Sequence, residues 1–201
     1  MIAWEEKRDV RQQVLTDIIR RRRSIFADDY LDIPVPEDVI REILTNATWA
    51  PTYKMTQPWR FIVLQDSQRA PFGEYLAEYY RQRLPAEEWP HTRHERARLY
   101  PEKAPCIIVI VLRRNLKIDI KEWEEMAAVC CAVQNMALTC EAYNIGAYWD
   151  SCDACIEYAR QHWLEENEQC LGFFYMGYYD RQKHHSAKRR TGIDKKTTWL
   201  Y

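Results

Sequence analysis

Glycine is scarce in this chain of 201 residues. Only five glycines are present, and no two of them form a G-x-G pair. A dinucleotide-binding fingerprint and a Walker loop both need clustered glycines, because their backbone must approach a phosphate closely. The sequence therefore excludes both motifs, and side chains must hold any phosphate that the protein binds.

Long apolar runs and an excess of one charge are also lacking. The longest apolar run, Cys106 to Leu112, is too short to span a bilayer. The formal net charge of -1 gives no global electrostatic reason to bind nucleic acid or an anionic membrane. Residues 1–10 are charged and lack the apolar stretch of a signal peptide. Together with seven cysteines, an odd number, these features predict a cytoplasmic protein with reduced thiols.

Helical and strand-like apolar patterns alternate along the chain. Helices are expected over residues 5–22, after Pro36, and over residues 68–82, 122–143 and 156–166. Strands are expected over residues 61–64, 106–112, 147–149 and 173–178, and the run 197–201 has strand propensity that could add to another sheet. The β-branched run 106–112 is typical of a strand buried on both faces. This interleaving predicts a single domain over residues 1–201, of α/β or α+β class.

Residues 84–103 stand apart from this pattern. They are dense in charge and contain three of the nine prolines. We expect an irregular helical excursion on the surface, and the segment is a candidate lid.

An arginine run ends the first expected helix. Arg21, Arg22 and Arg23 are followed by Ser24. A guanidinium fork matches phosphate bidentately and stays charged at any working pH, so this run is a candidate phosphate site. The alternative is a solvated helix end, where cations also complement the helix dipole.

The most informative stretch is residues 50–61, Ala-Pro-Thr-Tyr-Lys-Met-Thr-Gln-Pro-Trp-Arg-Phe. It begins at a proline, and Pro58 holds the entry to the following strand extended. Between the prolines lie hydroxyls, an amide and a lysine, which suit a flat ring with hydrogen-bonding edges. An ordinary helix-to-strand turn is the alternative interpretation.

Together, the Arg-Arg-Ser element and this loop resemble the nitroreductase family of FMN-dependent oxidoreductases. The resemblance extends over nearly the whole chain and includes residues 122–125, the turn at Gly146 and residues 172–178. It implies an α+β fold with a central mixed β-sheet wrapped by helices. It also implies an intertwined homodimer with FMN at the subunit interface.

The resemblance further implies which residues contact FMN. Arg22, Arg23 and Ser24 would reach the phosphate and the pyrimidine edge of the ring. The loop would come from the other subunit and lie against the flavin; its matching residues are Pro51, Thr52, Tyr53, Met55 and Gln57. Tyr53 stands where family members often have a small residue or histidine.

Two later segments complete the implied site. Trp149, Asp150 and Ser151 match the strand end whose backbone N–H contacts the flavin N5 atom, with Asp150 or Ser151 as the donor. The Asp150 carboxylate would point away from the flavin, and it could also begin the next helix. Arg189 and Arg190 are candidates for the late basic residue that reaches the phosphate.

The implied function is NAD(P)H-dependent reduction of a nitroaromatic, quinone or similar small acceptor by a ping-pong mechanism. The same fold could instead serve dehalogenation or flavin fragmentation. Cys152 and Cys155 form a C-x-x-C, which could belong to a thiol or metal-binding module. A structural zinc needs four ligands, and the chain has no second C-x-x-C, so no metal is expected.

Overall fold

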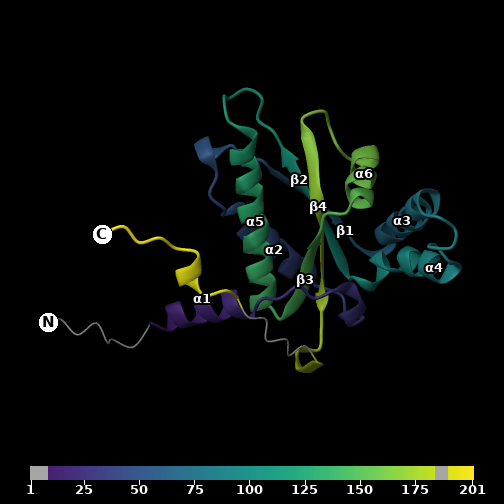
Figure 1. Ribbon diagram of the computed structural model, residues 1–201, viewed down its shortest axis with the longest axis horizontal. Coiled ribbons are helices and arrows are strands. Elements are labelled where there is room, and N and C mark those ends of the chain that lie inside the picture. The colour runs from purple at the N-terminus through teal and green to yellow at the C-terminus, as the bar shows by residue number, and fades with distance from the viewer. Residues whose placement is uncertain (1–8, 184–189) are drawn as a thin grey trace.

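A four-stranded β-sheet forms the centre of the protein in a computed structural model that describes residues 9–183 and 190–201 (Figure 1). Its strands follow the order β1-β2-β4-β3, and all neighbours pair antiparallel. The strands are β1 (Trp59–Leu64), β2 (Cys106–Arg113), β3 (Ile145–Asp150) and β4 (Glu168–Tyr178).

The predicted α+β class is confirmed, but parallel pairing is confined among the described residues to an isolated bridge between Ser24 and Ala147. The expected mixture of strand directions is thus reduced to this bridge. The remaining run with strand propensity, residues 197–201, forms no strand and extends away from the sheet, with Leu200 92% exposed.

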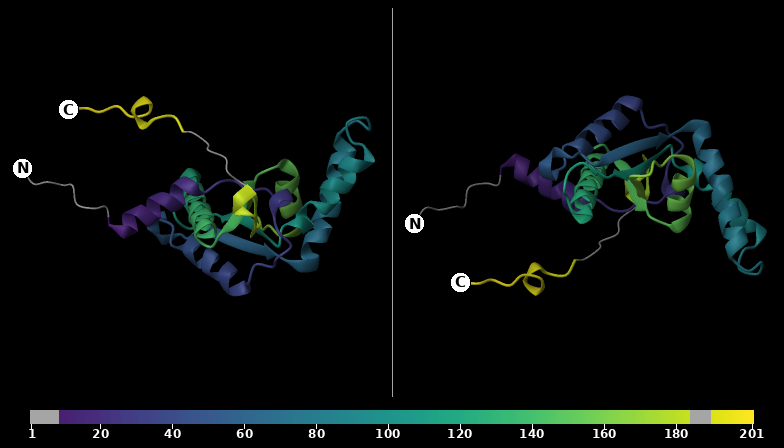
Figure 2. Two further views of the ribbon diagram at one scale, coloured as in Figure 1. Left: turned by 90° about the horizontal axis from the view of Figure 1, so that it is seen from below. Right: turned by 90° about the horizontal axis from the view of Figure 1, so that it is seen from above.

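Six α-helices surround the sheet in the described part of the chain. They are α1 (Val10–Arg21), α2 (Glu37–Thr48), α3 (Ala70–Arg83), α4 (His91–Leu99), α5 (Glu122–Ala142) and α6 (Asp153–His162). Helices α2 and α5 cover one face, whereas α3 and α6 cover the other (Figure 2). Short 3₁₀ helices lie at Ala27–Asp29, Tyr53–Met55, Asp66–Arg69, Pro101–Lys103, Arg181–Lys183 and Ile193–Lys195.

Strand β2 joins the two halves of the core. Cys106, Ile108 and Ile110 pack with α2 and α5, whereas Ile107 and Val109 pack with α3 and α6. All five side chains are fully buried, because successive residues of a strand point to opposite faces. The prediction of a strand buried on both faces is confirmed.

Element boundaries differ from the predictions by a few residues. Pro36 is the N-cap of α2 rather than its first residue. Helix α6 begins at Asp153, before the predicted start, and its N-cap is Cys152. The segment 84–103 contains α4, which with α3 forms a hairpin that projects from the body (Figure 2). No helix within residues 9–183 and 190–201 combines the length and apolarity needed to cross a membrane.

A buried ion-pair network fastens one end of the sheet. The Glu168 carboxylate, 0% exposed, accepts hydrogen bonds from Nε of Arg60 and from Nε of Arg113, both at 2.7 Å. Burial alone would raise the pKa of Glu168, but these hydrogen bonds outweigh it and hold the pKa at about 2. The network ties β1, β2 and β4 together where the three strands meet.

Candidate functional site

A cavity of about 190 Å³ lies between α5 and β3. Three parts of the chain wall it: the segment after α1, one face of α5, and the β3–β4 edge of the sheet. Its lining residues are Arg22, Ser24, Cys130, Val133, Gln134, Ala137, Ala147, Tyr148, Trp149 and Phe174. The structure therefore brings together three of the residues predicted for the site: Arg22, Ser24 and Trp149.

The α5 wall was not predicted as part of the site. Cys130, Val133, Gln134 and Ala137 recur at helical spacing, so they share one face of α5. Residues 122–143 were predicted as a helix, but the stripe formed by these four residues was not assigned to the site. The polar Gln134 within the stripe was the signal of a different role.

The segment after α1 is held against β3. Ser24 forms a bridge with Ala147, and the Ile25 N–H donates to the Ala147 carbonyl at 3.2 Å. This pairing fixes the position of Arg22 and Arg23 relative to β3.

The neighbouring arginines Arg22 and Arg23 have different surroundings. Nη1 of Arg23 donates to the carbonyl oxygens of Arg20, Arg21 and Arg22 at 2.5, 3.1 and 2.9 Å, so it caps the C-terminus of α1. The half-buried Arg22 side chain lines the cavity and makes no hydrogen bond or ion pair with residues 9–183 or 190–201. Arg22 is therefore the cation that remains available at the cavity.

A β-bulge places the Trp149 ring at the cavity. Between Ile110 and Val111 the register of β2 with β4 shifts, so that Leu171 is the extra residue of β4. The next residue, Gly172, has a φ of 124°, which favours glycine. The bulge lets the Trp149 Nε1–H donate to the Leu171 carbonyl at 2.9 Å, which fixes the orientation of the ring.

Asp150 and Ser151 follow Trp149 but do not line the cavity. A side-chain oxygen of Asp150, Oδ1, accepts a hydrogen bond from the Cys152 N–H at 3.0 Å. The carboxylate therefore faces the start of α6, and Ser151 is exposed. The contact between a backbone N–H of Asp150 or Ser151 and a ligand in the cavity stays a prediction.

The loop from Pro51 to Gln57 lies near the start of α5, whereas the cavity faces the middle of this helix. Nζ of Lys54 donates to the Asp119 carbonyl at 3.4 Å, just before α5 begins. The twelve helical steps from Glu122 to Gln134 alone span about 18 Å at the rise of an α-helix. Within one chain, the predicted site residues thus form two separate groups.

The loop has an unusual backbone. Lys54, Met55 and Gln57 have φ values of 51°, 55° and 46°, which are costly for residues other than glycine. A hydrogen bond within the loop stabilises the turn: Oγ1 of Thr52 accepts from the Gln57 N–H at 3.1 Å. Tyr53 is 56% exposed and Met55 is 72% exposed. An exposed loop held in such a conformation is typical of a binding surface.

The late basic residues are not placed at the cavity. Arg189 lies outside the described residues. Arg190 is exposed and does not line the cavity between α5 and β3.

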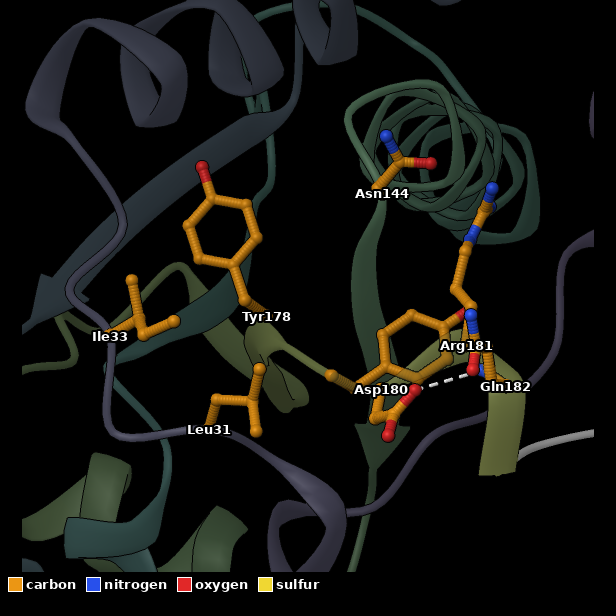
Figure 3. Close-up of a pocket in the computed structure, with 8 residues that line it drawn as sticks. Leu31, Ile33, Asn144, Tyr178, Asp180, Arg181 and Gln182 are labelled. Atoms are coloured by element: carbon orange, nitrogen blue, oxygen red, sulfur yellow. Dashed lines mark hydrogen bonds between the residues drawn. The ribbon is translucent and has the colours of Figure 1, made fainter.

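A second cavity, of about 670 Å³, lies beside the end of β4 (Figure 3). It is lined by Leu31, Ile33, Asn144, Tyr178, Tyr179, Asp180, Arg181 and Gln182. None of the predicted site residues is among them. Its arginine, Arg181, pairs with the buried carboxylate of Glu141, so its charge is already neutralised.

Comparison with known proteins identifies the family of this chain. The model of the Nitroreductase family matches residues 19–178, which include both groups of predicted site residues. The chain therefore belongs to the nitroreductase family.

Individual relatives are similar along most of their length. YfhC of Bacillus subtilis (strain 168), provisionally named an NAD(P)H nitroreductase, is 28% identical over 183 residues, which cover 90% of this chain and 91% of YfhC. A Desulfovibrio desulfuricans protein solved in complex with FMN has a TM-score of 0.69 and 26% identity, covering 93% of this chain and 97% of its own. The FMN-dependent nitroreductase NfnB of Mycobacterium smegmatis, solved with NADPH, shares the fold (TM-score 0.75, 18% identity, coverage 94% and 99%).

Proposed function

We propose that the protein is an FMN-dependent oxidoreductase that takes a hydride from NAD(P)H and reduces a nitroaromatic, quinone or similar small acceptor. The observation that carries this proposal is the cavity between α5 and β3, where Arg22 lies without a partner among the described residues. Names of relatives point to the same donor and cofactor.

The residues at the cavity fit the parts of FMN. Arg22 and Ser24 offer a permanent cation and a hydroxyl for the phosphate or the polar edge of the ring. Gln134 offers an amide, which can donate and accept hydrogen bonds. Trp149 and Phe174 offer flat apolar surface for the ring system.

The small size of the cavity supports a site to which one chain contributes only a part. Pockets for small molecules typically measure about 300–1,000 Å³. The cavity measures about 190 Å³. We propose that the loop Pro51–Gln57 of a second copy completes the site, in a homodimer with FMN at the interface.

Exposed apolar side chains on α1 support the dimer. Val10, Val14 and Leu15 are 71, 52 and 56% exposed, and none of the twelve residues of α1 is buried. An isolated helix of this length is marginal in water, so its apolar face needs a covering surface. Analytical ultracentrifugation should give a dimer at micromolar concentration, whereas a monomer loaded with flavin would contradict the shared site.

The chain's own residues would position the cofactor. FMN, when bound, supplies the hydride chemistry. Arg22 would hold the phosphate, Trp149 would border the ring, and a backbone N–H of Asp150 or Ser151 would donate to N5. The donor and the acceptor would occupy one place in turn, which is a ping-pong mechanism.

The projecting segment 84–103 is proposed as a lid. The seven free cysteines support a cytoplasmic location, because thiols stay reduced there.

The identity of the cofactor tests the proposal directly. Flavin released from the purified protein by denaturation should be FMN, at one molecule per chain, when separated by chromatography. Release of FAD, or of no flavin even after reconstitution with FMN, would contradict the proposed function.

Steady-state kinetics test the shared place for donor and acceptor. Double-reciprocal plots at several acceptor concentrations should give parallel lines with NADH or NADPH as the donor. Intersecting lines would show that both substrates bind together, and the ping-pong scheme would then be wrong.

A further inference from the structure

The C-x-x-C sequence lies where β3 ends and α6 begins. Cys152 is the N-cap of α6 and is partly exposed, whereas Cys155 lies in its first turn and is 0% exposed. Their two Sγ atoms are 2.9 Å apart. Cys152 is therefore the more accessible of the two residues, and the sulfur of the buried Cys155 lies directly beside the sulfur of Cys152.

The thiol pair is separate from the cavity proposed for the flavin. Cys155 belongs to the core beneath α3 and α6, with Phe173 and Tyr175, and Cys152 packs against that core. The cavity opens on the α5 side of the sheet, and neither sulfur lines it. The proposed reductase function therefore leaves this pair unused.

The surroundings of the two thiols make them unequal. The hydrogen bond from the Cys155 thiol lowers the pKa of Cys152, although burial and the Asp150 carboxylate act against this shift. The Tyr80 hydroxyl, from α3, also hydrogen-bonds to Cys152 and favours its thiolate. For Cys155, the hydrogen bond to Cys152 and burial both raise the pKa. This asymmetry is typical of a C-x-x-C pair at the start of a helix, in which the exposed sulfur is the nucleophile.

The spacing of the sulfurs favours a disulfide over a metal. Ligand atoms of Asp150, Cys152 and Cys155 lie within 4.8 Å of one another. These three ligands are one fewer than the four that a structural zinc needs. Two thiolates bound at about 2.3 Å to a tetrahedral zinc lie roughly 3.8 Å apart. At 2.9 Å the sulfurs are too close for that arrangement and are already side by side for bond formation.

We propose that Cys152 and Cys155 are a dithiol–disulfide redox pair, a second redox site in the protein that exchanges with low-molecular-weight disulfides such as glutathione disulfide. The Cys152 thiolate attacks one sulfur of glutathione disulfide, forms a mixed disulfide and releases one glutathione thiolate. Cys155 then loses its proton and attacks Sγ of Cys152, which forms the intrachain disulfide and releases the second glutathione. The protein gives up two electrons and two protons, and glutathione disulfide becomes two molecules of glutathione.

The test is a redox titration of the purified full-length protein in mixtures of glutathione and glutathione disulfide. Samples are quenched with acid, alkylated with iodoacetamide and digested for mass spectrometry. As the disulfide fraction rises, the peptide that contains residues 152–155 should lose both alkyl groups and carry an intrachain disulfide. If both thiols are alkylated at every ratio, the proposal is wrong.

Variants assign the two roles. Cys155→Ser should retain one glutathione on Cys152, because no second thiol can release it, whereas Cys152→Ser should retain none at position 155. Cys131→Ser, which removes an exposed thiol of α5, should leave the yield of the 152–155 disulfide unchanged. If Cys155→Ser does not fold, the same mixed disulfide should be trapped on Cys152 of the wild type by early acid quenching.

Two further results would overturn the proposal: absence of glutathione on Cys152 in both experiments, or one tightly bound zinc per chain in the protein as purified. Neither measurement depends on flavin, so failure here would leave the proposed reductase function standing.

Discussion

Two groups of arginines in this protein place the same charge in different surroundings. Arg60 and Arg113 converge on the buried carboxylate of Glu168, at the end of the sheet. Arg22 lines a cavity, and its guanidinium has no hydrogen-bond or ion-pair partner among residues 9–183 and 190–201. Its neighbour Arg23 is an intermediate case, because it binds backbone carbonyls at the end of α1.

Arg60 and Arg113 hold the fold, whereas Arg22 is proposed to bind a ligand. A charge that is matched inside the chain stabilises the native state and has little left to offer another molecule. A guanidinium at a cavity with no carboxylate nearby keeps its capacity for an anion.

The largest effect is expected from removing the buried charge in Glu168→Gln. The pKa of Glu168 falls from an ordinary value of 4.5 to about 2 on folding, so its ionised form should contribute about 3 kcal/mol to stability at pH 7. Because the folded pKa is the lower one, this contribution is fully present above pH 4.5 and is lost as the pH falls toward 2.

Urea unfolding of wild type and Glu168→Gln at several pH values measures this difference. It should shrink from about 3 kcal/mol at pH 7 to near zero at the acid end. Glu165→Gln is the matched control, since Glu165 is 68% exposed and reaches Arg113 only at 3.4 Å. A difference that does not depend on pH would show that the Glu168 charge is not the source of the effect.

The next effect concerns the unmatched arginine. Arg22→Ala should weaken FMN binding by about 2 kcal/mol, close to thirtyfold in Kd, because it removes a charge-assisted contact to phosphate. Unfolding of the flavin-free protein should be unchanged. A fluorescence titration of the apoprotein with FMN measures the affinity. Arg21→Ala is the control, since Arg21 pairs with the exposed Asp17 at 3.0 Å; equal affinity in both variants would remove Arg22 from the phosphate site.

The smallest effect is expected at the intermediate arginine. Arg23→Ala should lower the free energy of unfolding by about 1 kcal/mol, because carbonyls at the end of α1 lose their donor. Its effect on FMN affinity should be smaller than that of Arg22→Ala. Should the same urea and FMN titrations show unchanged stability and a larger loss of affinity, Arg23 rather than Arg22 would be the phosphate ligand.

Local patterns were enough to predict most of the fold. The β-branched run of β2 and the helical periodicity of α5 depend on residues close in sequence, so their classes were predicted correctly. Helix ends were less certain because they depend on caps, as at Cys152. The partner of Arg60 could not be predicted, because Glu168 lies 108 residues away and only the sheet order brings the two together.

The candidate site was predicted in parts rather than as a whole. Arg22 and Ser24 carry a recognisable motif, and the structure places both at one cavity. The stripe of α5 that faces them was not assigned to the site, since helical spacing alone does not tell a cavity wall from a core. The separation between that cavity and the loop Pro51–Gln57 depends on tertiary contacts that place the loop beside the start of α5, and no local motif encodes such contacts.

The bulge at Gly172 also determines how freely the sequence can vary. A Cβ atom there would lie 2.3 Å from the Asp150 carbonyl oxygen and 2.6 Å from Nε1 of Trp149. In a library of single substitutions, even alanine at this position should be depleted, whereas the exposed Gln169 on the same strand should accept many residues. The geometry of the candidate site thus depends partly on Gly172, a residue that contributes no side chain to the cavity. Constraint at such a position comes from the backbone of the bulge and not from the chemistry of a functional group.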